Sequence, residues 1–238
     1  MAHGKRYSDG LKEFDRDTLY APDEALALVK KLATAKFDET VEVHMRLGID
    51  PRKAEQQIRD AIVMPAGLGR TVRILVFAEG EAARIAEEAG ADIIADDEVI
   101  GRIANQGFTE FDVAIAVPDM MRKLGRLGKV LGPRGLMPSP KGGTVVPPED
   151  IPRVIQEARS GRIEFRNDRT GNLHVPIGKA SFEVSGLKAN FSALMDAVRR
   201  ARPSSLKGIY VRKLVVTSTM GPGIKVDPNA AIQLETPE

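Results

Sequence analysis

The segment Pro65-Ala66-Gly67-Leu68-Gly69 separates two different sequence patterns. Before it, residues 40–47 alternate strictly between polar and apolar side chains, which is the pattern of a strand with one buried face. After it, continuous apolar stretches at residues 72–78, 92–95 and 111–117 alternate with charged stretches of helical length. Such stretches are typical of parallel strands that helices cover on both faces. The chain therefore changes from one kind of sheet to another at this segment.

The alternating pattern returns after Ser160-Gly161. Apolar Ile163 and Phe165 alternate with charged neighbours. Asn167–Gly171 has the composition of a β-hairpin turn that leads into a returning strand. A further strand is expected at Tyr210–Thr217. Antiparallel sequence thus brackets the parallel block on both sides.

The economical interpretation is one domain inserted into another. We predict a split α+β domain, with an antiparallel sheet and helices, formed by residues 1–67 and 160–238. It is interrupted at residues 68–159 by an inserted α/β, Rossmann-like domain of three layers. The insertion begins and ends near small residues, so we expect its two ends to lie close together.

The composition is that of a folded protein without covalent cross-links. Of the 238 residues, 42% are hydrophobic and 29% are charged, which suffices for a buried core and excludes an intrinsically disordered chain. No apolar run has the length of a membrane span, and none follows the N-terminus as in a signal peptide. Because cysteine is absent, disulfides and thiolate metal sites are excluded. We expect a soluble, intracellular protein with no membrane partner.

Positive charge is concentrated in two places. The net charge is only +2, yet residues 160–238 carry 12 basic and seven acidic residues. Residues 121–148, called here the basic segment, carry six basic residues and no acidic one. Concentrated cations with exposed backbone N–H groups suit phosphates, whereas a membrane surface would call for a basic amphipathic helix with aromatic anchors. The charge pattern favours a nucleic-acid partner.

Glycine and proline are frequent in the basic segment and exclude a regular helix or a central strand over most of its length. Apolar residues within it can anchor it on a core, so we predict an ordered functional loop. The alternative is a flexible, solvated linker. The expected anchors are Val130, Leu131, Leu136, Met137 and Val145.

An enzymatic function finds little support. The turn after the first apolar strand, Ala78-Glu79-Gly80-Glu81, lacks the glycines of a dinucleotide site, and its acids would repel phosphate. The sequence has no Walker motif and no recognisable nucleophile with its base. His3, His44 and His174 are scattered and have no metal-ligand spacing. We therefore expect no catalytic residue, no cofactor and no metal. A nucleotide-using enzyme built on the insertion stays open as the alternative function.

Three polar segments of the split domain favour RNA binding: Lys36–Glu42, Asn167–Gly171 and Thr217–Gly221. If they cluster, they form a surface of hydroxyl, amide and carboxylate groups with flanking cations. Selective RNA binding needs such mixed groups, because cations alone fix phosphates without discriminating sites. Glu42 would accept from a 2′-OH or a base amine, or else is an ordinary strand carboxylate. Met220 would pack on a nucleotide, although its spacing alone favours a core position.

Four blocks of the chain resemble the bacterial ribosomal protein L1 family, in collinear order over essentially the whole length. They are Lys36-Phe37-Asp38-Glu39-Thr40-Val41-Glu42, Leu131-Gly132-Pro133-Arg134-Gly135-Leu136-Met137-Pro138, Gly161-Arg162-Ile163-Glu164-Phe165-Arg166-Asn167-Asp168 and Thr219-Met220-Gly221-Pro222. The resemblance implies a two-domain fold whose split domain binds the stalk region of large-subunit ribosomal RNA near the tRNA exit site. It also implies that the protein assists release of deacylated tRNA and represses translation of its own operon mRNA.

The same resemblance implies the site residues and the cellular setting. The RNA-binding positions are Lys36, Phe37, Thr40, Glu42, Asp168, Arg169, Thr170, Thr219, Met220 and Gly221. A secondary contact with RNA or with exit-site tRNA would involve Arg126, Lys129, Arg134 and Lys141. The protein would be a monomer when free of the ribosome and would act in the cytoplasm, in the large subunit. Lys213 stands where the family is expected to have a small hydroxyl residue, and the tail after Pro228 is expected to be unstructured.

Overall fold

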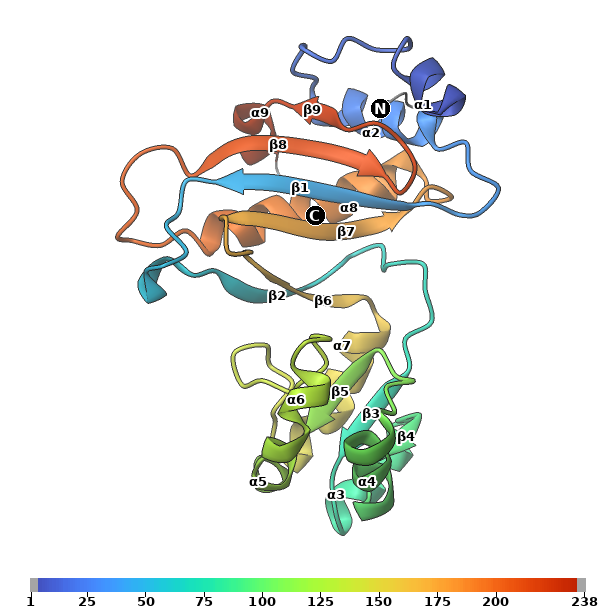
Figure 1. The fold of residues 1–238 in the computed structure, drawn as a ribbon, viewed down its shortest axis with the longest axis vertical. Helices are drawn as coiled ribbons and strands as arrows, with labels where there is room; N and C mark the ends of the chain where they lie inside the picture. The colour runs from blue at the N-terminus through green and yellow to red at the C-terminus, as the bar shows by residue number, and fades with distance from the viewer. Residues whose placement is uncertain (1–3, 235–238) are drawn as a thin grey trace. The chain divides into compact units, whose positions relative to one another are not determined.

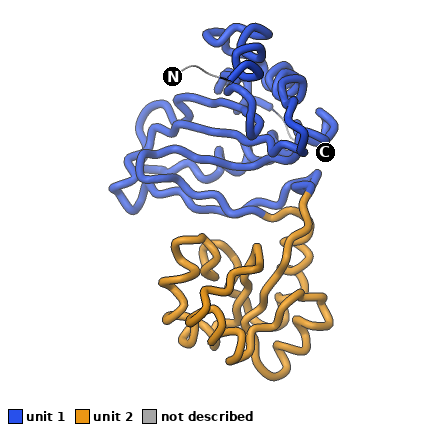
Figure 2. The backbone as a smooth tube through the Cα atoms, turned by 45° about the vertical axis from the view of Figure 1, so that its right-hand side comes forward, with its two compact units in different colours: residues 1–69, 163–238 blue, residues 70–162 orange. Residues whose placement is uncertain are grey.

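The computed structural model describes residues 4–234 and divides into two compact units. Unit 1 consists of Met1–Gly69 and Ile163–Glu238, and unit 2 is Arg70–Arg162 (Figure 2). Unit 1 contains an antiparallel sheet with helices, and unit 2 contains a parallel sheet. The predicted fold class, a split α+β fold interrupted by an α/β insertion, is therefore confirmed.

Unit 1 is built around a four-stranded sheet in the order β7-β1-β8-β9, with a separate two-stranded sheet of β2 and β6 (Figure 1). All three strand pairs of the larger sheet are antiparallel. The elements of this unit are α1 (Lys5–Gly10), α2 (Pro22–Leu32), β1 (Thr40–Leu47), η1 (Ala54–Gln56), β2 (Arg59–Val63), β6 (Arg162–Arg166), β7 (Asn172–Lys179), α8 (Val184–Arg200), β8 (Val211–Ser218), β9 (Ile224–Val226) and α9 (Pro228–Ile232).

The alternation in β1 explains how this sheet forms two unlike faces. Val41, Val43, Met45 and Leu47 are at most 1% exposed and belong to a core that also contains residues of α2 and α8. Both helices lie on this side of the sheet, behind it in Figure 1. Proline at the first position of α2 and two acidic residues in its first turn suit a helix start. The polar face of the sheet is left uncovered by the described helices.

The predicted hairpin between β6 and β7 is wrong. Asn167–Gly171 forms a turn, but β6 pairs with β2, whereas β7 pairs with β1. The side chain of Asn167 gives the reason, since its Oδ1 accepts from Ile58 N at 2.6 Å while Asn167 N donates to Ile58 O at 3.1 Å. These bonds hold the end of β6 beside the segment that leads into β2. The two strands therefore diverge from the turn.

The expectation of an unstructured tail after Pro228 is also wrong for the described part. Residues Pro228–Ile232 form α9, whose start is capped by Asp227 accepting from Asn229 N at 2.9 Å. Ala231 is fully buried in the core of unit 1, and α9 contacts α8 and β8. Residues 235–238 lie outside the described residues.

Unit 2 has a three-stranded parallel sheet in the order β4-β3-β5. Because β4 and β5 lie on opposite sides of β3, right-handed crossovers place α3 and α4 on opposite faces of the sheet. Its elements are β3 (Ile74–Phe77), α3 (Glu81–Glu88), β4 (Ile93–Ile94), α4 (Asp97–Gln106), β5 (Val113–Ala116), η2 (Pro118–Met120), α5 (Met121–Leu124), η3 (Gly125–Leu127), α6 (Gly128–Leu131), η4 (Pro148–Asp150) and α7 (Ile151–Arg159).

Local sequence signals set the elements of unit 2. All four residues of β3 are completely buried, as expected for a strand covered on both faces. Helix α4 begins where the Asp96 side chain accepts from Val99 N and ends at Gly107, whose φ of 68° is the left-handed conformation that favours glycine. None of the helices within residues 4–234 is both long and apolar enough to cross a membrane.

Candidate nucleic-acid interface

Two of the three predicted segments meet where β1 begins and β8 ends. The register places Val41 opposite Ser218, so Thr40 and Thr219 are neighbours. Thr40 N donates to Thr219 Oγ1 at 2.9 Å, and Lys179 Nζ donates to Thr40 Oγ1 at 2.9 Å. We call this cluster the threonine end. It consists of Lys36, Phe37, Thr40, Glu42, Thr219, Met220 and Gly221.

A buried carboxylate, Glu39, fixes the threonine end. Its side chain is 1% exposed and accepts from Ala35 N at 2.8 Å, Ser218 Oγ at 2.7 Å and Met220 N at 2.9 Å. Burial alone would raise the pKa of Glu39, but the N–H groups of Met220 and Ala35, the hydroxyl and then Arg6 outweigh it, so the pKa is lowered. Glu39 thus ties the loop before β1 to the turn after β8.

Sequence reasoning missed Glu39 as a positioning residue. Asp38 and Glu39 are adjacent acids before a strand, and nothing in the sequence distinguishes the buried one. Asp38 remains exposed and accepts from Ser181 N at 3.0 Å and Ser181 Oγ at 2.7 Å. The two neighbours therefore hold the loop against different partners, one inside the protein and one at its surface.

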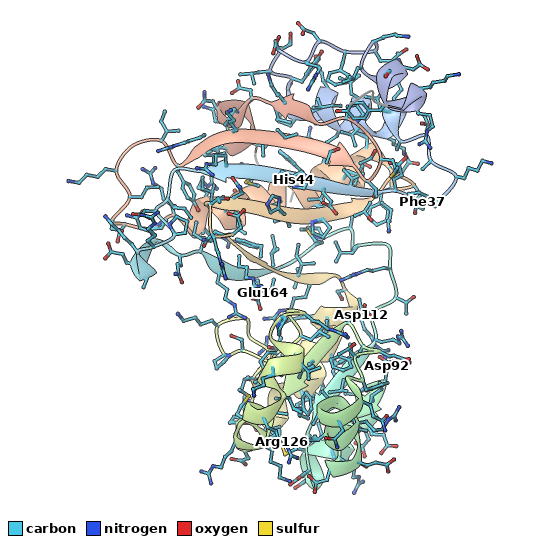
Figure 3. All side chains as sticks on the ribbon, viewed as in Figure 1. Phe37, His44, Asp92, Asp112, Arg126 and Glu164 are labelled. Atoms are coloured by element: carbon cyan, nitrogen blue, oxygen red, sulfur yellow. The ribbon has the colours of Figure 1, made fainter. Side chains whose placement is uncertain are left out.

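Two large apolar side chains stand exposed on this fixed frame. Phe37 is 55% exposed and Met220 is 56% exposed, whereas most large apolar residues of the unit are buried. The core position that spacing favours for Met220 is therefore wrong. Figure 3 shows Phe37 beyond the end of the sheet where β1 begins. Exposed apolar and aromatic groups beside hydroxyls suit stacking on unpaired bases.

The turn after β8 requires glycine at position 221. A Cβ on Gly221 would lie 2.5 Å from Ser218 Oγ, the hydroxyl that donates to Glu39. Gly221 N donates to Ser218 O at 3.1 Å, and Thr217 Oγ1 lies 3.2 Å from Gly221 O. A side chain at this position would therefore displace either the Ser218 hydroxyl from Glu39 or the turn itself. Gly221 therefore acts through the shape of the turn that presents Met220.

The third predicted segment does not join this cluster. Asn172, the first residue of β7, pairs with Arg46 near the end of β1, so the turn before it lies at the opposite end of the strand. Arg46 lies six positions after Thr40 along β1, which corresponds to roughly 20 Å. The clustering hypothesis therefore holds for two segments only. The physical reason is that β7 runs antiparallel to β1.

Asp168 organises that distant turn with both of its oxygens. It accepts from the backbone N–H groups of Thr170 and Asn172, each at 2.8 Å, and from the side chains of the same two residues. Burial works against ionisation, but these bonds outweigh it and hold the pKa of Asp168 far below its ordinary value. Arg46 donates to Thr170 O and so ties the turn to β1. Arg169 is exposed and has no polar partner within residues 4–234.

Between the two ends, the uncovered face of the sheet carries a histidine pair that sequence reasoning missed. His44 of β1 and His174 of β7 are register partners, and their Nδ1 atoms are 2.8 Å apart. Figure 3 shows His44 near the middle of the sheet. The two residues are 130 positions apart in the chain, so only strand pairing brings them together. They have Glu42 on one side and Asp168 on the other.

A groove of about 750 Å³ opens where β6 and β7 diverge. Its lining includes Arg166, Arg169 and His174, together with the ion pair of Arg59 and Glu164 at 2.5 Å. Glu164 is labelled in Figure 3 on β6. The groove therefore extends the polar surface from the histidine pair to the exposed Arg166 and Arg169.

In unit 2 the basic segment is ordered, as predicted, although its first part forms short helices rather than a loop. Leu124, Leu127 and Leu131 are fully buried there. Of the expected anchors, Leu131 is buried, Val130, Leu136 and Met137 pack against the core, and Val145 bridges to Ala116. The four secondary-site cations are Arg126, Lys129, Arg134 and Lys141. Within residues 4–234 they are exposed and make neither ion pairs nor hydrogen bonds through their side chains. Figure 3 labels Arg126.

A hollow in unit 2 disfavours a nucleotide. A hollow of about 430 Å³ lies beyond the carboxyl ends of β3 and β5, where α/β folds bind ligands. Its charged lining residues are Glu79, Glu81 and Asp119, which would repel phosphate. Lys123, close by, forms ion pairs with Glu79 and Asp97 and is therefore not free to bind phosphate. The described residues contain no group of three or more metal-ligating side chains.

Comparisons with known proteins identify the family of this chain. The chain matches the Ribosomal protein L1p/L10e family over residues 29–222. It is 58% identical over 233 residues to the large ribosomal subunit protein uL1 of Chloroflexus aurantiacus, covering 98% of both chains. It is 57% identical to uL1 of Chloroflexus aggregans, covering 94% of this chain and 95% of the relative, and 54% identical to uL1 of Dehalococcoides mccartyi, covering 97% of each. The chain belongs to the ribosomal protein L1p/L10e family.

Proposed function

We propose that this protein is a structural component of the large ribosomal subunit in the cytoplasm, and that unit 1 binds the stalk region of the ribosomal RNA. The relatives are named as large ribosomal subunit proteins, and the match covers nearly the whole chain. The family is one of structural ribosomal proteins, so the protein is not an enzyme.

The observation that carries RNA binding is the threonine end. Hydroxyl groups, a carboxylate and two exposed apolar side chains are held there by the buried Glu39. Free cations are few at this place, since Lys36 is the only lysine or arginine of the cluster as defined above. A surface of this kind reads base edges and 2′-hydroxyls, because its donors and acceptors are directional. Glu42 would accept from such a hydroxyl or from a base amine.

The expected site residues divide into direct and indirect contributors. Phe37, Thr40, Glu42, Thr219 and Met220 would contact the RNA directly. Gly221 and Asp168 would shape turns, because the carboxylate of Asp168 already accepts four hydrogen bonds within its own turn. The remaining expected contacts, which would bind phosphate or sugar, are Lys36, Arg169 and Thr170.

We further propose two regulatory and translational roles that the resemblance implies. A surface that recognises RNA by shape and mixed polar groups also binds a messenger RNA with the same local fold, which is how the protein would repress its own operon. The four secondary-site cations of the basic segment suit the phosphates of a tRNA near the exit site, so unit 2 would assist release of deacylated tRNA.

The test is a filter-binding titration of the intact protein with a stalk fragment of the ribosomal RNA and with a scrambled duplex of equal length. We expect a preference of at least a hundredfold for the stalk fragment. A mode that relies on many phosphates would lose roughly a thousandfold or more between low and moderate salt, and we expect a shallower loss. A steep salt dependence without discrimination would overturn direct recognition by the threonine end.

The regulatory role has its own measurement. The leader of the operon mRNA should compete with the stalk fragment for the same protein, and the Met220→Asp variant should lose both RNAs in parallel. If that variant lost the stalk fragment but kept the leader, the two RNAs would use different surfaces, and the proposal of shared recognition would fail.

A further inference from the structure

The two described histidines form a pair whose role the threonine end does not explain. His44 Nδ1 and His174 Nδ1 are 2.8 Å apart, and the ring centroids are 5.0 Å apart. His44 Nε2 lies 3.6 Å from Glu42, and His174 Nε2 lies 3.7 Å from Asp168. Four ionisable groups therefore form one row across two strands. The row joins the threonine end to the turn of Asp168.

The position of the pair makes it accessible to anything that lies on the threonine end. His44 follows Glu42 by two residues on the same face of β1, a separation of roughly 6.8 Å. The side chain of His174 is 55% exposed and that of His44 is 31% exposed. The helices that cover the sheet lie on its opposite face (Figure 1). An RNA helix seated at Thr40 and Glu42 would extend over the pair.

The contact between the two rings limits their charge. In a hydrogen bond between two Nδ1 atoms, one atom carries the proton and the other accepts with its lone pair. Both rings cannot be imidazolium while this bond lasts. Burial, and then the charge of His174, lower the pKa of His44, while Glu42 acts in the opposite direction. In the free protein His44 therefore holds a proton less readily than an isolated histidine would.

We propose that His44 and His174 are a phosphate-binding pair of the RNA interface, and that RNA binding adds a proton to them. This inference rests on the proposed function of unit 1. An RNA phosphate oxygen would accept from the ring N–H groups in place of the bond between the rings. Its negative charge would favour the doubly protonated pair, which offers donors on both rings.

The charges around the pair make the phosphate necessary for this proton. The two carboxylates in the row lie 3.6 and 3.7 Å from the Nε2 atoms, and the nearby cations lie on four strands and in the turn. The charged groups that face the pair or line the groove beside it are Glu42 and Arg46 of β1, Glu164 and Arg166 of β6, Asp168 and Arg169 of the turn, Arg59 of β2 and Lys213 of β8. Three of the eight are acidic and five are basic, so these groups carry a net charge of +2 and disfavour a second proton until the negative phosphate is bound.

If RNA binding adds a proton, RNA affinity must fall as the pH rises. RNA raises the pKa of the pair in the complex above its value in the free protein. The added affinity is therefore present below the free-protein pKa and is lost as the pH rises through the value in the complex. A rise of one unit at one histidine corresponds to about tenfold in affinity. Since the full factor is reached only well below the free-protein pKa, we expect wild-type affinity for the stalk fragment to be roughly three- to fivefold higher at pH 6.0 than at pH 7.5.

The experiment compares the intact wild type with the double variant His44→Gln, His174→Gln at both pH values and constant ionic strength. Glutamine keeps polar groups on the face but does not titrate, so the variant should change by less than twofold. Lys188→Gln, on α8 at the covered side of the sheet, removes one positive charge and should keep the wild-type pH dependence. Titration of the RNA itself is common to all three proteins and cancels.

A second measurement reads the protons directly. The imidazole NMR signals of His44 and His174 should titrate at higher pH with the stalk fragment bound than without it, which a merely structural pair would not show. Equal pH dependence in wild type and double variant, or unchanged imidazole titration, would overturn the inference while stalk binding itself persists. Absence of wild-type binding at either pH would instead overturn the proposed function. Thermal melts of each variant confirm that it is folded.

Discussion

The threonine end of unit 1 and the basic segment of unit 2 differ in how they hold their polar groups. At the threonine end, Glu39 accepts three hydrogen bonds and fixes backbone and side chains alike, and the exposed groups are mostly uncharged. In the basic segment, buried leucines hold the backbone while the four secondary-site cations extend from it without side-chain partners within residues 4–234. The first arrangement gives direction to each contact, and the second gives charge.

This difference teaches which surface selects the RNA. Free cations bind any phosphate and are screened by salt, so they raise affinity without discriminating among RNAs. Donors and acceptors at fixed positions discriminate, because a wrong partner leaves a desolvated group unpaired. The sequence draws attention to the basic segment first, since charge is visible in composition. The hydrogen-bonded frame around Glu39 is visible only in the fold.

The largest expected effect comes from Met220→Asp. It removes an exposed apolar contact and places a negative charge against the RNA, so the affinity for the stalk fragment should fall by roughly a hundredfold, about 2.7 kcal/mol. Met220 is 56% exposed, so stability should change little. Leu19→Asp is the matched control, because Leu19 is 57% exposed in the same unit. Filter binding measures the affinity of both variants for the stalk fragment. An equal loss of affinity in the two would place Met220 outside the interface.

The next largest effect concerns the hydrogen bonds of Glu39, which hold the turn that carries Met220. Glu39→Gln replaces an acceptor of three hydrogen bonds by an amide that also donates, which should cost roughly 1–3 kcal/mol of stability at pH 7. The lowered pKa of Glu39 means that its contribution is full above its ordinary value of 4.5 and is lost as the pH falls through the folded-state value. Wild type and variant should therefore converge in acid.

Urea melts of both proteins between pH 7 and pH 3 measure this convergence. Glu55→Gln in η1 changes an exposed glutamate and should leave stability nearly unaltered. A constant gap between wild type and Glu39→Gln at all pH values would show that the ionised carboxylate is not what stabilises the threonine end.

A smaller effect is expected when unit 2 is removed altogether. Replacing residues 70–162 by a short glycine-rich linker keeps every residue of the threonine end and should cost on the order of a kcal/mol in loop closure. The shortened protein should melt cooperatively and bind the stalk fragment within about tenfold of the intact chain, roughly 1.4 kcal/mol. Circular dichroism and filter binding test it. A folded protein with binding reduced a hundredfold would place the primary site on unit 2.

The smallest effect is expected from Arg134→Glu in the basic segment. Stalk affinity should fall only a few fold, and any phosphate contact by this residue would show as a decrease of about one in the salt slope. Arg84→Glu on α3 makes the same charge change elsewhere in unit 2 and serves as control. If Arg134→Glu were more damaging than Met220→Asp, the ranking of the two surfaces would have to be reversed.

The sequence by itself determined the two kinds of sheet. Alternation at Thr40–Leu47 and continuous apolar strands in unit 2 are local patterns, and burial reproduces them residue by residue. The bounds of helix α4 are also local, because its cap and its terminal glycine are adjacent in sequence to the helix that they bound. Such features depend on neighbours in the chain, so they can be read without the fold.

Only the tertiary structure decided which polar residues meet. Strand pairing joins Thr40 to Thr219 and His44 to His174 across more than a hundred residues, and it carries the turn of Asp168 to the other end of β1. It also separates β6 from β7, although the turn between them has a hairpin composition. Register and burial are properties of the assembled sheet, and for that reason neither the buried role of Glu39 nor the histidine pair could be predicted from the chain alone.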